Sequence, residues 1–323
     1  MQKITVGTRR SALAKTQTLQ VVEALQAANP GLQIDLQEVV TKGDQIQDRA
    51  LSEVGGKGLF VSEIEALIQD GTIDFAVHSM KDVPAELAAG LVIGCVPARA
   101  DARDLLISRN GYQLHSLPNG ARLGTSSLRR SAMVLEHNQH IVVESLRGNI
   151  DTRLRKLASL DAIILATAGV ARMGWWDGEQ FVIGDQVYHA SPLPVHEFLP
   201  AVGQGALALE CREDDANVLR ILRTLHDPHT AMATGAERAF LATVGGSCQV
   251  PVAAHASVTM TADHTLQLLV QGFIGLPDGS RSLREEVRGT PADALGEQLG
   301  KKMLERGGQV ILDMLAGGQA GWK

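Results

Sequence analysis

The sequence predicts an α/β fold, with two similar α/β domains around a cleft and a smaller C-terminal α+β domain. Short apolar strands alternate with amphipathic helices before Val250, which is typical of a parallel or mixed sheet. The turn Gly7–Ala12 has a counterpart in Gly124–Ala132, where Gly-Thr and Arg-Arg-Ser-Ala recur, so the two halves are expected to face each other as similar domains. After Val250 the pattern changes to a small antiparallel sheet and a closing helix.

Length and composition exclude several classes of protein. The chain has 323 residues, enough for two or three domains, and 45% of them are hydrophobic but only 3% aromatic, so the core is aliphatic. A net charge of −6 without a lysine-rich tail argues against general nucleic-acid binding. The N-terminus lacks the apolar run of a secretion signal and no stretch is long enough to span a bilayer, so we expect a soluble cytoplasmic protein.

The domain limits follow from changes in pattern. Lys3–Gly7 predicts an opening strand, and Asn29–Gly31 ends the amphipathic helix after it. Pro97–Asp104 is charged and non-periodic, which indicates a crossover between domains. The expected domains are 1–98 with a return segment at 200–225, then 99–199, and finally the α+β domain at 226–323.

The remaining elements are predicted from periodicity and turn residues. Residues Gly174–Phe198 are irregular, with a short hairpin expected there. The other expected strands are 34–40, 73–77, 91–96, 122–124, 141–145, 161–166, 206–210, 250–258, 266–274 and 282–288. The other expected helices are 60–68, 131–137, 149–158, 217–225, 230–243 and 291–306.

The stretch Ile73–Pro84 is the strongest local signal for a site. Its first five residues form a buried strand, and Pro84 prevents a regular continuation. Between them lie a hydroxyl (Ser79), a cation (Lys81) and a carboxylate (Asp82). In an α/β fold this is the carboxyl end of a strand, where ligands bind. The alternative to a ligand site is an ordinary polar surface loop. A site is favoured over that alternative only if other functional residues lie at the same edge.

Arginines concentrate in the second half of the α/β region. Residues 122–156 contain seven cations and three acids. Arg129, Arg130, Arg147 and Arg153 lie at predicted strand-to-helix turns or first helical turns, and Arg9 lies at the matching turn of the first half. Arginine binds carboxylates and phosphates in a bidentate manner, and helix N-termini favour anions. No Walker lysine pattern is present, so a ligand with many carboxylates is favoured over a nucleotide.

The three cysteines differ in context. Cys95 and Cys211 lie in or at the end of predicted strands, which indicates buried, inert thiols. Cys248 follows Gly-Gly-Ser on a loop between a helix and a strand, where glycines permit close approach of another molecule. There is no CxxC spacing and no adjacent histidine pair, so neither a metal site nor a disulfide framework is expected.

Five motifs follow one another along the chain: His78–Pro84 (HSMKDVP), Gly124–Arg130 (GTSSLRR), Ser145–Asn149 (SLRGN), Leu199–Gly205 (LPAVGQG) and Gly246–Pro251 (GSCQVP). They occur in the same order in the porphobilinogen deaminase (hydroxymethylbilane synthase) family, which the sequence resembles over essentially the whole chain. The resemblance implies two periplasmic-binding-protein-like α/β domains. It also implies a monomeric transferase of tetrapyrrole (porphyrin, heme) biosynthesis that condenses four porphobilinogen units into hydroxymethylbilane and releases ammonia.

The resemblance further implies a dipyrromethane cofactor, held by a thioether to Cys248 and made from the substrate itself. Asp82 matches the catalytic aspartate of the family. The positions that resemble cofactor contacts are Lys81, Ser79, Thr125, Ser127, Arg129 and Arg130. The positions that resemble substrate contacts are Arg9, Ser11, Arg147, Arg153, Arg172, Gln204, Phe60 and Lys57. No metal, nucleic acid or membrane partner is implied.

Two other classes are compatible with parts of the pattern. A non-catalytic bilobed anion-binding protein also has two α/β domains around a cleft, but such proteins are commonly exported and have no use for Cys248. A cysteine-nucleophile acyl transferase would pair Cys248 with a histidine, for which His78 is the candidate. Both alternatives require an unmodified Cys248, whereas the resemblance predicts a thioether there.

Overall fold

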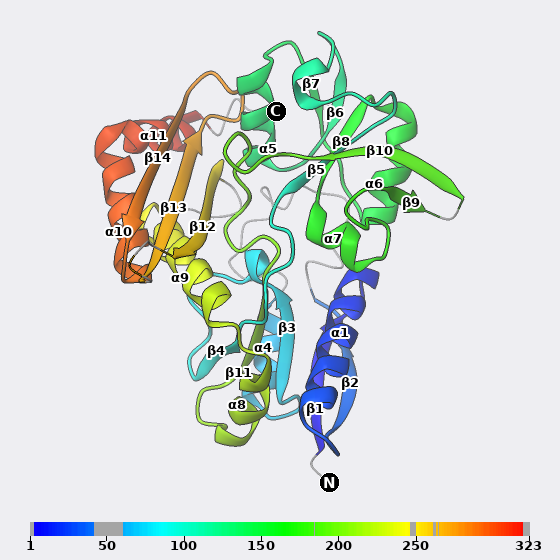
Figure 1. Cartoon of the computed structure of the whole chain (residues 1–323), viewed down its shortest axis with the longest axis vertical. Helices are drawn as coiled ribbons and strands as arrows, with labels where there is room; N and C mark the ends of the chain where they lie inside the picture. The colour runs from blue at the N-terminus through cyan, green and yellow to red at the C-terminus, as the bar shows by residue number, and fades with distance from the viewer. Residues whose placement is uncertain are drawn as a thin grey trace. The chain divides into compact units, whose positions relative to one another are not determined.

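A computed structural model describes residues 3–41, 61–183, 185–245, 250–260, 263 and 265–318. The chain forms two compact units, Met1–Ala100 with Gly203–Ala231, and Asp101–Val202 with Met232–Lys323. Each unit contains one α/β sheet, and the second also contains a three-stranded antiparallel sheet (Figure 1). The predicted fold class is confirmed in these elements, and the predicted limits of three domains stay a prediction.

The first unit is built on a five-stranded sheet. Its elements are β1 (Lys3–Arg9), α1 (Ala12–Ala28), β2 (Gln33–Val39), α4 (Ser62–Gln69), β3 (Phe75–Ser79), the 3₁₀ turn η1 (Met80–Asp82), β4 (Leu91–Cys95), β11 (Leu207–Arg212), α8 (Ala216–Leu222) and the 3₁₀ turn η4 (Arg223–Leu225). The strand order is β2-β1-β3-β11-β4. β1 is parallel to β2 and β3, whereas β11 is antiparallel to β3 and β4.

Helices cover both faces of this sheet. Phe75 and Val77 of β3 pack in a cluster with Val21 of α1 and with residues of α8. Ala76, which points to the opposite face, packs with Ile68 of α4. Because both faces are covered, the first three residues of β3, Phe75–Val77, are all apolar instead of alternating with polar residues.

The second unit contains a six-stranded sheet. Its elements are β5 (Asp104–Ser108), the 3₁₀ turn η2 (Leu114–Ser116), β6 (Arg122–Gly124), α5 (Leu128–His137), β7 (Val142–Glu144), α6 (Ile150–Lys156), the 3₁₀ turn η3 (Leu157–Ser159), β8 (Ala162–Ala166), α7 (Thr167–Arg172), β9 (Phe181–Ile183) and β10 (Gln186–Pro192). The strand order is β7-β6-β8-β5-β10-β9. β6 is parallel to β7 and β8, whereas β5 is antiparallel to β8 and β10.

The two α/β sheets share one topology. In each, a first strand (β1 or β6) lies between two parallel neighbours, and an antiparallel strand (β11 or β5) follows beyond them. The repeated Gly-Thr pattern falls at the carboxyl ends of β1 and β6. A Cβ on Gly7 would collide with Ile73, and one on Gly124 would lie 2.7 Å from Leu160 Cδ1, so close packing explains the glycine in both copies.

Two sequence predictions in this sheet are corrected. The predicted turn at 125–130 is shorter, because α5 begins at Leu128 and not at Ser131. The Ser127 hydroxyl accepts a hydrogen bond from the Arg130 backbone N–H and caps the helix, so Arg129 and Arg130 lie in its first turn. The segment after Gly174 contributes more than a hairpin, because β10 joins the main sheet beside β5.

The paired tryptophans belong to the core of this sheet. Trp176 is buried and forms an isolated bridge with Phe181, whose ring packs edge-to-face on Tyr188. Trp175 packs against the same cluster. Their role in the described structure is therefore to fill the core beside β9 and β10, the last two strands of this sheet.

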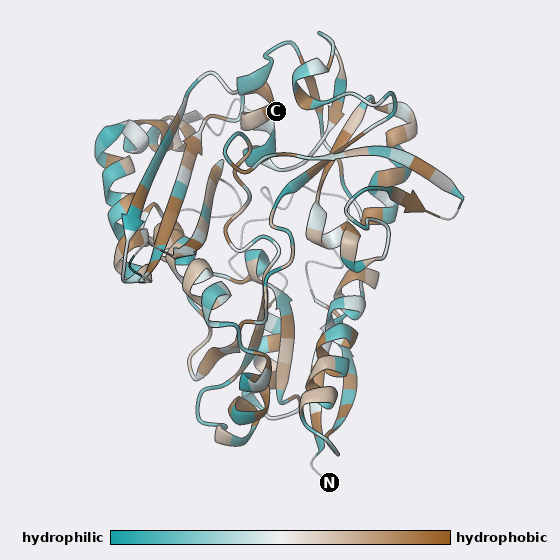
Figure 2. Ribbon diagram, viewed as in Figure 1, coloured by the Kyte–Doolittle hydropathy of each residue, from teal (hydrophilic) through white to brown (hydrophobic). Residues whose placement is uncertain are grey.

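The three-stranded sheet is β12 (Val252–Met260), β13 (Leu266–Gly275) and β14 (Ser282–Gly289). Its helices are α9 (Pro228–Thr243), α10 (Ala292–Met303) and α11 (Gln309–Gly318), with a π turn, η5 (Leu304–Gly308), between the last two. The single closing helix predicted for 291–306 is therefore too short. Figure 2 shows β13 mostly hydrophobic and β14 mostly hydrophilic, as expected for a central strand beside an edge strand.

The three-stranded sheet packs on the second α/β sheet through α5. Phe273 of β13 lies in one buried cluster with Met133 of α5. Glu136, near the end of α5, accepts hydrogen bonds from Ser282 Oγ (2.5 Å) and Arg284 Nη2 (2.5 Å) of β14. One short helix thus carries arginines in its first turn and anchors the antiparallel sheet in its last.

Candidate active site

The candidate site of the first unit begins where β3 ends. Ser79 is half-buried and its hydroxyl accepts a hydrogen bond from Gln17 Nε2 of α1 (3.1 Å). The next residue, Met80, is buried, and its backbone N–H donates to the Ala206 carbonyl (3.0 Å). The chain is therefore held on both sides at the point where it leaves the sheet.

Asp82 is the residue that this turn presents to solvent. Met80 and Val83 are buried on either side of it, and the Val83 N–H donates to the Met80 carbonyl (3.1 Å). Pro84 fixes the following backbone dihedral. Lys81 is half-buried, whereas Asp82 is exposed. The sequence thus positions a carboxylate by its backbone and leaves the side chain open to a ligand.

Gly203 supports the same turn from the return segment. It has a φ of +69°, and a Cβ there would lie 2.5 Å from Met80 Cγ. Gln204 is buried, and its carbonyl accepts a hydrogen bond from Arg99 Nε (2.8 Å). Gly203, in the LPAVGQG motif, therefore packs directly against Met80, the first residue of the turn that carries Asp82.

Arg9 and Ser11 lie at the same edge of the first sheet. β1 and β3 are parallel neighbours, so their carboxyl ends meet. Arg9 is half-buried at the end of β1. The Ser11 hydroxyl accepts a hydrogen bond from the Ala14 N–H (3.2 Å), so it caps α1. The structure thus brings Arg9 and Ser11 to the sheet edge that also carries Ser79 and Asp82.

A buried histidine–glutamate pair lies behind this edge. His78 Nε2 is 2.9 Å from Glu210 Oε2, and the two side chains are 4% and 0% exposed. The other carboxylate oxygen, Glu210 Oε1, is buried with no hydrogen-bond partner among the described residues. The sequence indicates His78 only as the partner of a cysteine nucleophile and does not indicate Glu210.

The second unit carries a corresponding edge, formed by the carboxyl ends of three parallel strands, β7, β6 and β8. Thr125 follows β6 and is buried, with its N–H donating to the Glu144 carbonyl of β7 (2.8 Å). Ser126 Oγ donates to the Leu146 carbonyl (2.8 Å), which ties the turn after β6 to the turn after β7. Ser127 is half-buried and caps α5.

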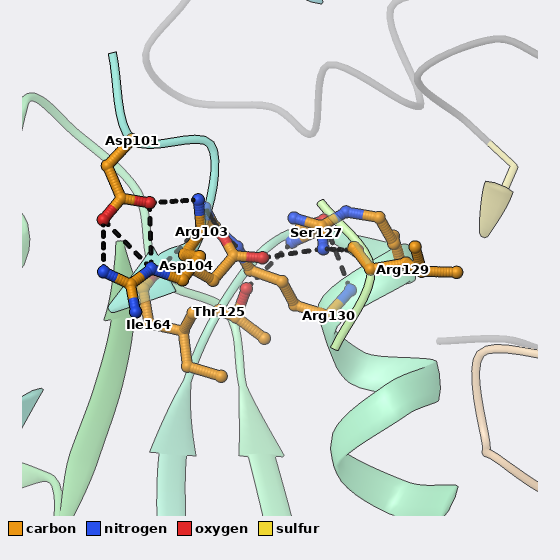
Figure 3. A network of polar contacts seen from close by, with 9 residues as sticks. Asp101, Arg103, Asp104, Thr125, Ser127, Arg129, Arg130 and Ile164 are labelled. Carbon is orange, nitrogen blue, oxygen red and sulfur yellow. Dashed lines mark hydrogen bonds and ion pairs between the residues drawn. The ribbon is translucent and has the colours of Figure 1, made fainter. Parts of the chain in front are cut away.

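Arg129 and Arg130 share one buried carboxylate, Asp104 (Figure 3). Arg129 Nη1 donates to Asp104 Oδ2 (2.7 Å) and to the Leu199 carbonyl (2.7 Å). Arg130 donates to Asp104 Oδ1 through Nε (3.0 Å) and Nη2 (2.6 Å), and to the Ile164 carbonyl through Nη1 (2.9 Å). All three side chains are less than 10% exposed.

This cluster is strongly electropositive for a buried site. Burial lowers the pKa of the Arg130 guanidinium; Asp104 opposes that shift, and the neighbouring charge of Arg129 adds to it. The first turn of α5 contains no acidic residue, although a helix N-terminus already favours anions. Among the described residues, Asp104 is the only carboxylate that pairs with either arginine. Two cations and one anion leave a charge that suits a carboxylate ligand.

Three further predicted arginines lie after the parallel strands. Arg147 is half-buried in the turn after β7, and Arg153 Nε donates to the Gly148 carbonyl (2.8 Å). Burial lowers the pKa of Arg172, at the end of α7, to about 10. All three belong to turns or helices that follow β7 or β8 in the chain, with Arg172 at the far end of α7.

Three predicted site residues, Lys57, Phe60 and Cys248, lie outside the described residues. Cys95 and Cys211 are buried, free thiols, as predicted. Across the parts of the chain that the structure describes, no cluster of three or more histidine, cysteine, aspartate or glutamate side chains is arranged to hold a metal ion. Within the same parts, no helix has both the length and the apolar character needed to cross a membrane.

The fold and these edges define an α/β protein with cationic side chains gathered after the carboxyl ends of its parallel strands. The chain belongs to the porphobilinogen deaminase family. Residues 4–220 match the family model described as "Porphobilinogen deaminase, dipyromethane cofactor binding domain", and residues 231–305 match "Porphobilinogen deaminase, C-terminal domain". The resemblance predicted from five motifs is thereby confirmed, and with it the cofactor type of the family.

Relatives named porphobilinogen deaminase align along almost the whole chain. The protein of Macrococcus caseolyticus is 48% identical over 98% of this chain and 99% of its own. That of Brevibacillus brevis is 50% identical over 98% of both chains. Solved structures align more weakly: the methionine binding protein MetQ covers 71% of this chain and 92% of its own, at 14% identity and a TM-score of 0.41, which is too low to establish a shared fold.

Proposed function

We propose that this chain is a hydroxymethylbilane synthase, a transferase that joins four porphobilinogen units head to tail and releases ammonia at each addition. The observation that carries the proposal is the match to both family domains over 4–220 and 231–305. The buried arginines of the second unit add a physical reason, because each porphobilinogen unit brings an acetate and a propionate that need cationic partners.

A dipyrromethane group fits the residues present. The Arg129–Arg130–Asp104 cluster has one more cation than anion, and Arg129 Nε and Nη2 have no hydrogen-bond partner among the described residues. When bound, such a group supplies a covalent primer to which substrate units are added. Cys248 would hold it by a thioether, and Lys81, Ser79, Thr125, Ser127, Arg129 and Arg130 would contact it.

Asp82 would act on the incoming substrate. Loss of ammonia from porphobilinogen leaves an electron-poor methylene-pyrrolenine cation, which a fixed carboxylate stabilises. The same carboxylate would hydrogen-bond pyrrole N–H groups and move a proton to the leaving amine. Its exposed position between two buried neighbours, Met80 and Val83, suits this role.

The remaining predicted residues would hold substrate and growing chain through their carboxylates. This set is Arg9, Ser11, Arg147, Arg153, Arg172, Gln204, Phe60 and Lys57. Burial that lowers the pKa of Arg172 to about 10 still leaves it charged at neutral pH, as a carboxylate partner must be. We further propose that the protein is cytoplasmic and acts as a monomer. Sedimentation of the purified chain would test the monomeric state.

The direct test is to incubate the purified full chain with porphobilinogen and to measure ammonia release together with the formation of hydroxymethylbilane. The proposal predicts both, in a ratio of four ammonia molecules for each linear tetrapyrrole. Binding of porphobilinogen without ammonia release would favour the non-catalytic anion-binding protein instead.

A further inference from the structure

The two arginines of α5 differ in how much of their hydrogen-bonding capacity the protein itself uses. A guanidinium group offers its Nε–Nη2 side as a two-pronged donor that fits a carboxylate. In Arg130 this side donates to Asp104 Oδ1 at 3.0 and 2.6 Å, and the remaining nitrogen, Nη1, donates to the Ile164 carbonyl. Arg130 is therefore bonded to protein through all three nitrogens.

Arg129 is held from the opposite side. Both of its hydrogen bonds, to Asp104 Oδ2 and to the Leu199 carbonyl, leave from Nη1. Its Nε–Nη2 side makes no hydrogen bond within the described part of the chain. Arg129 Cζ also lies over the Phe198 ring, 5.8 Å from its centroid, within the range of a cation–π interaction.

Stability alone does not account for this arrangement. Two guanidinium groups in the first turn of a helix oppose the helix dipole, and burial adds a desolvation cost for each charge. Asp104 is fully buried at the first residue of β5 and neutralises only one of them. The nearby Asp101–Arg103 pair shows the contrast, because it is balanced one to one, with Arg103 Nη2 2.7 Å from Asp101 Oδ2, and partly exposed (Figure 3).

We propose that Asp104 is a positioning residue: it holds Arg129 by Nη1 so that the Nε–Nη2 side stays turned to a carboxylate of the pyrrole ligand, while it fixes Arg130 within the protein. This inference rests on the proposed function and adds a residue to its site. Asp104 itself does not touch the ligand.

The test follows covalent uptake of pyrrole units, by intact mass, when apo full-length protein is incubated with a series of porphobilinogen concentrations. The variants are Asp104→Asn, which removes the charge with little change in shape, and Asp101→Asn, the matched control in the exposed pair. Far-UV circular dichroism and a cooperative thermal transition establish that each variant folds. If the wild type gains no mass, the proposed function fails, and that result is separate from the comparison between variants.

The proposal predicts that Asp104→Asn takes up pyrrole units about 10- to 100-fold more slowly at low porphobilinogen and needs a higher concentration for half-maximal rate. Asp101→Asn should stay within about twofold of the wild type, as expected for an exposed pair. A purely electrostatic role predicts the opposite sign, because losing Asp104 makes the cluster more positive. Uptake by folded Asp104→Asn at or above the wild-type rate would overturn the proposal.

A second variant distinguishes the positioning role of Asp104 from its effects on the net charge of the cluster and on folding. Asp104→Asn combined with Arg130→Gln has one cation and no anion in the cluster, so its net charge equals that of the wild type. It removes the unbalanced buried guanidinium that endangers folding of Asp104→Asn, yet Arg129 still lacks its anchor. Arg130→Gln alone is the reference, because it measures what the loss of Arg130 itself costs. Slower uptake by the double variant than by Arg130→Gln supports positioning by Asp104, and equal uptake by these two variants contradicts it.

Discussion

The imidazole of His78 lies 2.9 Å from the Glu210 carboxylate, and both side chains are buried within the first sheet. His78 is followed directly by Ser79 and by the turn that carries Asp82. Because the two strands that carry the pair, β3 and β11, are antiparallel neighbours, the pair fastens the return segment to the strand that presents the candidate site.

We predict that Glu210→Gln lowers the free energy of unfolding by about 1.5–3 kcal/mol, because a neutral amide replaces the charged acceptor of a buried hydrogen bond. Urea denaturation of the two proteins measures the difference. The control is Asp35→Asn, which breaks the exposed Lys3–Asp35 pair and should cost less than about 1 kcal/mol. Equal losses of unfolding free energy in the two variants would show that the buried pair stabilises the fold no more than the exposed pair does.

Asp82→Asn should lower kcat by about 100-fold or more, because the amide retains the shape of the side chain but not its charge or basicity. The melting temperature should not change, since Asp82 is exposed. Glu86→Gln, an exposed acid on the same loop, is the matched control and should keep wild-type kcat. A kcat for Asp82→Asn within threefold of the wild type would remove Asp82 from the proposed chemistry.

Gly203→Ala tests whether the LPAVGQG motif supports the turn at Met80. Gly71 is the control, because it also has a positive φ (+78°) but no atom within 4 Å of the position that a Cβ would occupy. Gly71→Ala should cost about 1 kcal/mol of unfolding free energy from backbone strain alone. Gly203→Ala should cost about 1–3 kcal/mol more, since the methyl group overlaps Met80, and kcat should fall with it. Equal costs and an unchanged kcat would contradict this support.

The buried thiols should be inert in the folded protein. Burial raises the pKa of Cys95 to about 12 and of Cys211 to about 11, so both stay protonated at pH 8. In Cys248→Ala, iodoacetamide should label neither thiol at this pH until the protein is unfolded. Rapid labelling of either one in the native state, followed by peptide mass mapping, would contradict the buried placement.

The same pKa shifts predict loss of stability at alkaline pH. An unfolded chain releases these thiol protons near pH 8.5, whereas the folded protein keeps them until about pH 11–12. The contribution of the buried, protonated thiols to the free energy of unfolding is therefore fully present below about pH 8.5. Above this pH, the free energy of unfolding falls by up to about 1.4 kcal/mol for each thiol and each pH unit. Cys95→Ala/Cys211→Ala should lose this part of the slope in denaturation curves between pH 8.5 and 10.5.

Most of the fold could be predicted because its sequence signals are local. Phe75–Val77 is apolar and Pro84 ends the run, which predicts β3, although the strand extends from Phe75 to Ser79 and not over the predicted 73–77. The predicted start of α5 is wrong because Arg129 and Arg130 suggest a polar turn, whereas the Ser127 cap decides the boundary. β10 is not predicted as a strand of the main sheet because its pairing with β5 is long-range and leaves no local pattern.

The site was predictable residue by residue only where the motifs match the family. The sequence places Asp104 in a crossover segment, although it immediately precedes the apolar strand residues Leu105–Ile107. Its signal is indirect: two arginines in a helical first turn without an acid require a counter-ion from elsewhere in the chain. Glu210 leaves no such signal, because a single acid inside an apolar strand does not indicate its partner.

The central claim is that this chain carries a covalent pyrrole primer on Cys248 and extends it with porphobilinogen. The most direct test is the intact mass of the denatured protein after incubation with porphobilinogen, compared with Cys248→Ala treated in the same way. The account predicts an excess of two covalently linked pyrrole units on the wild type, with further units during turnover, and the bare chain mass for the variant. A bare mass for the wild type, or the same excess on both proteins, would contradict it.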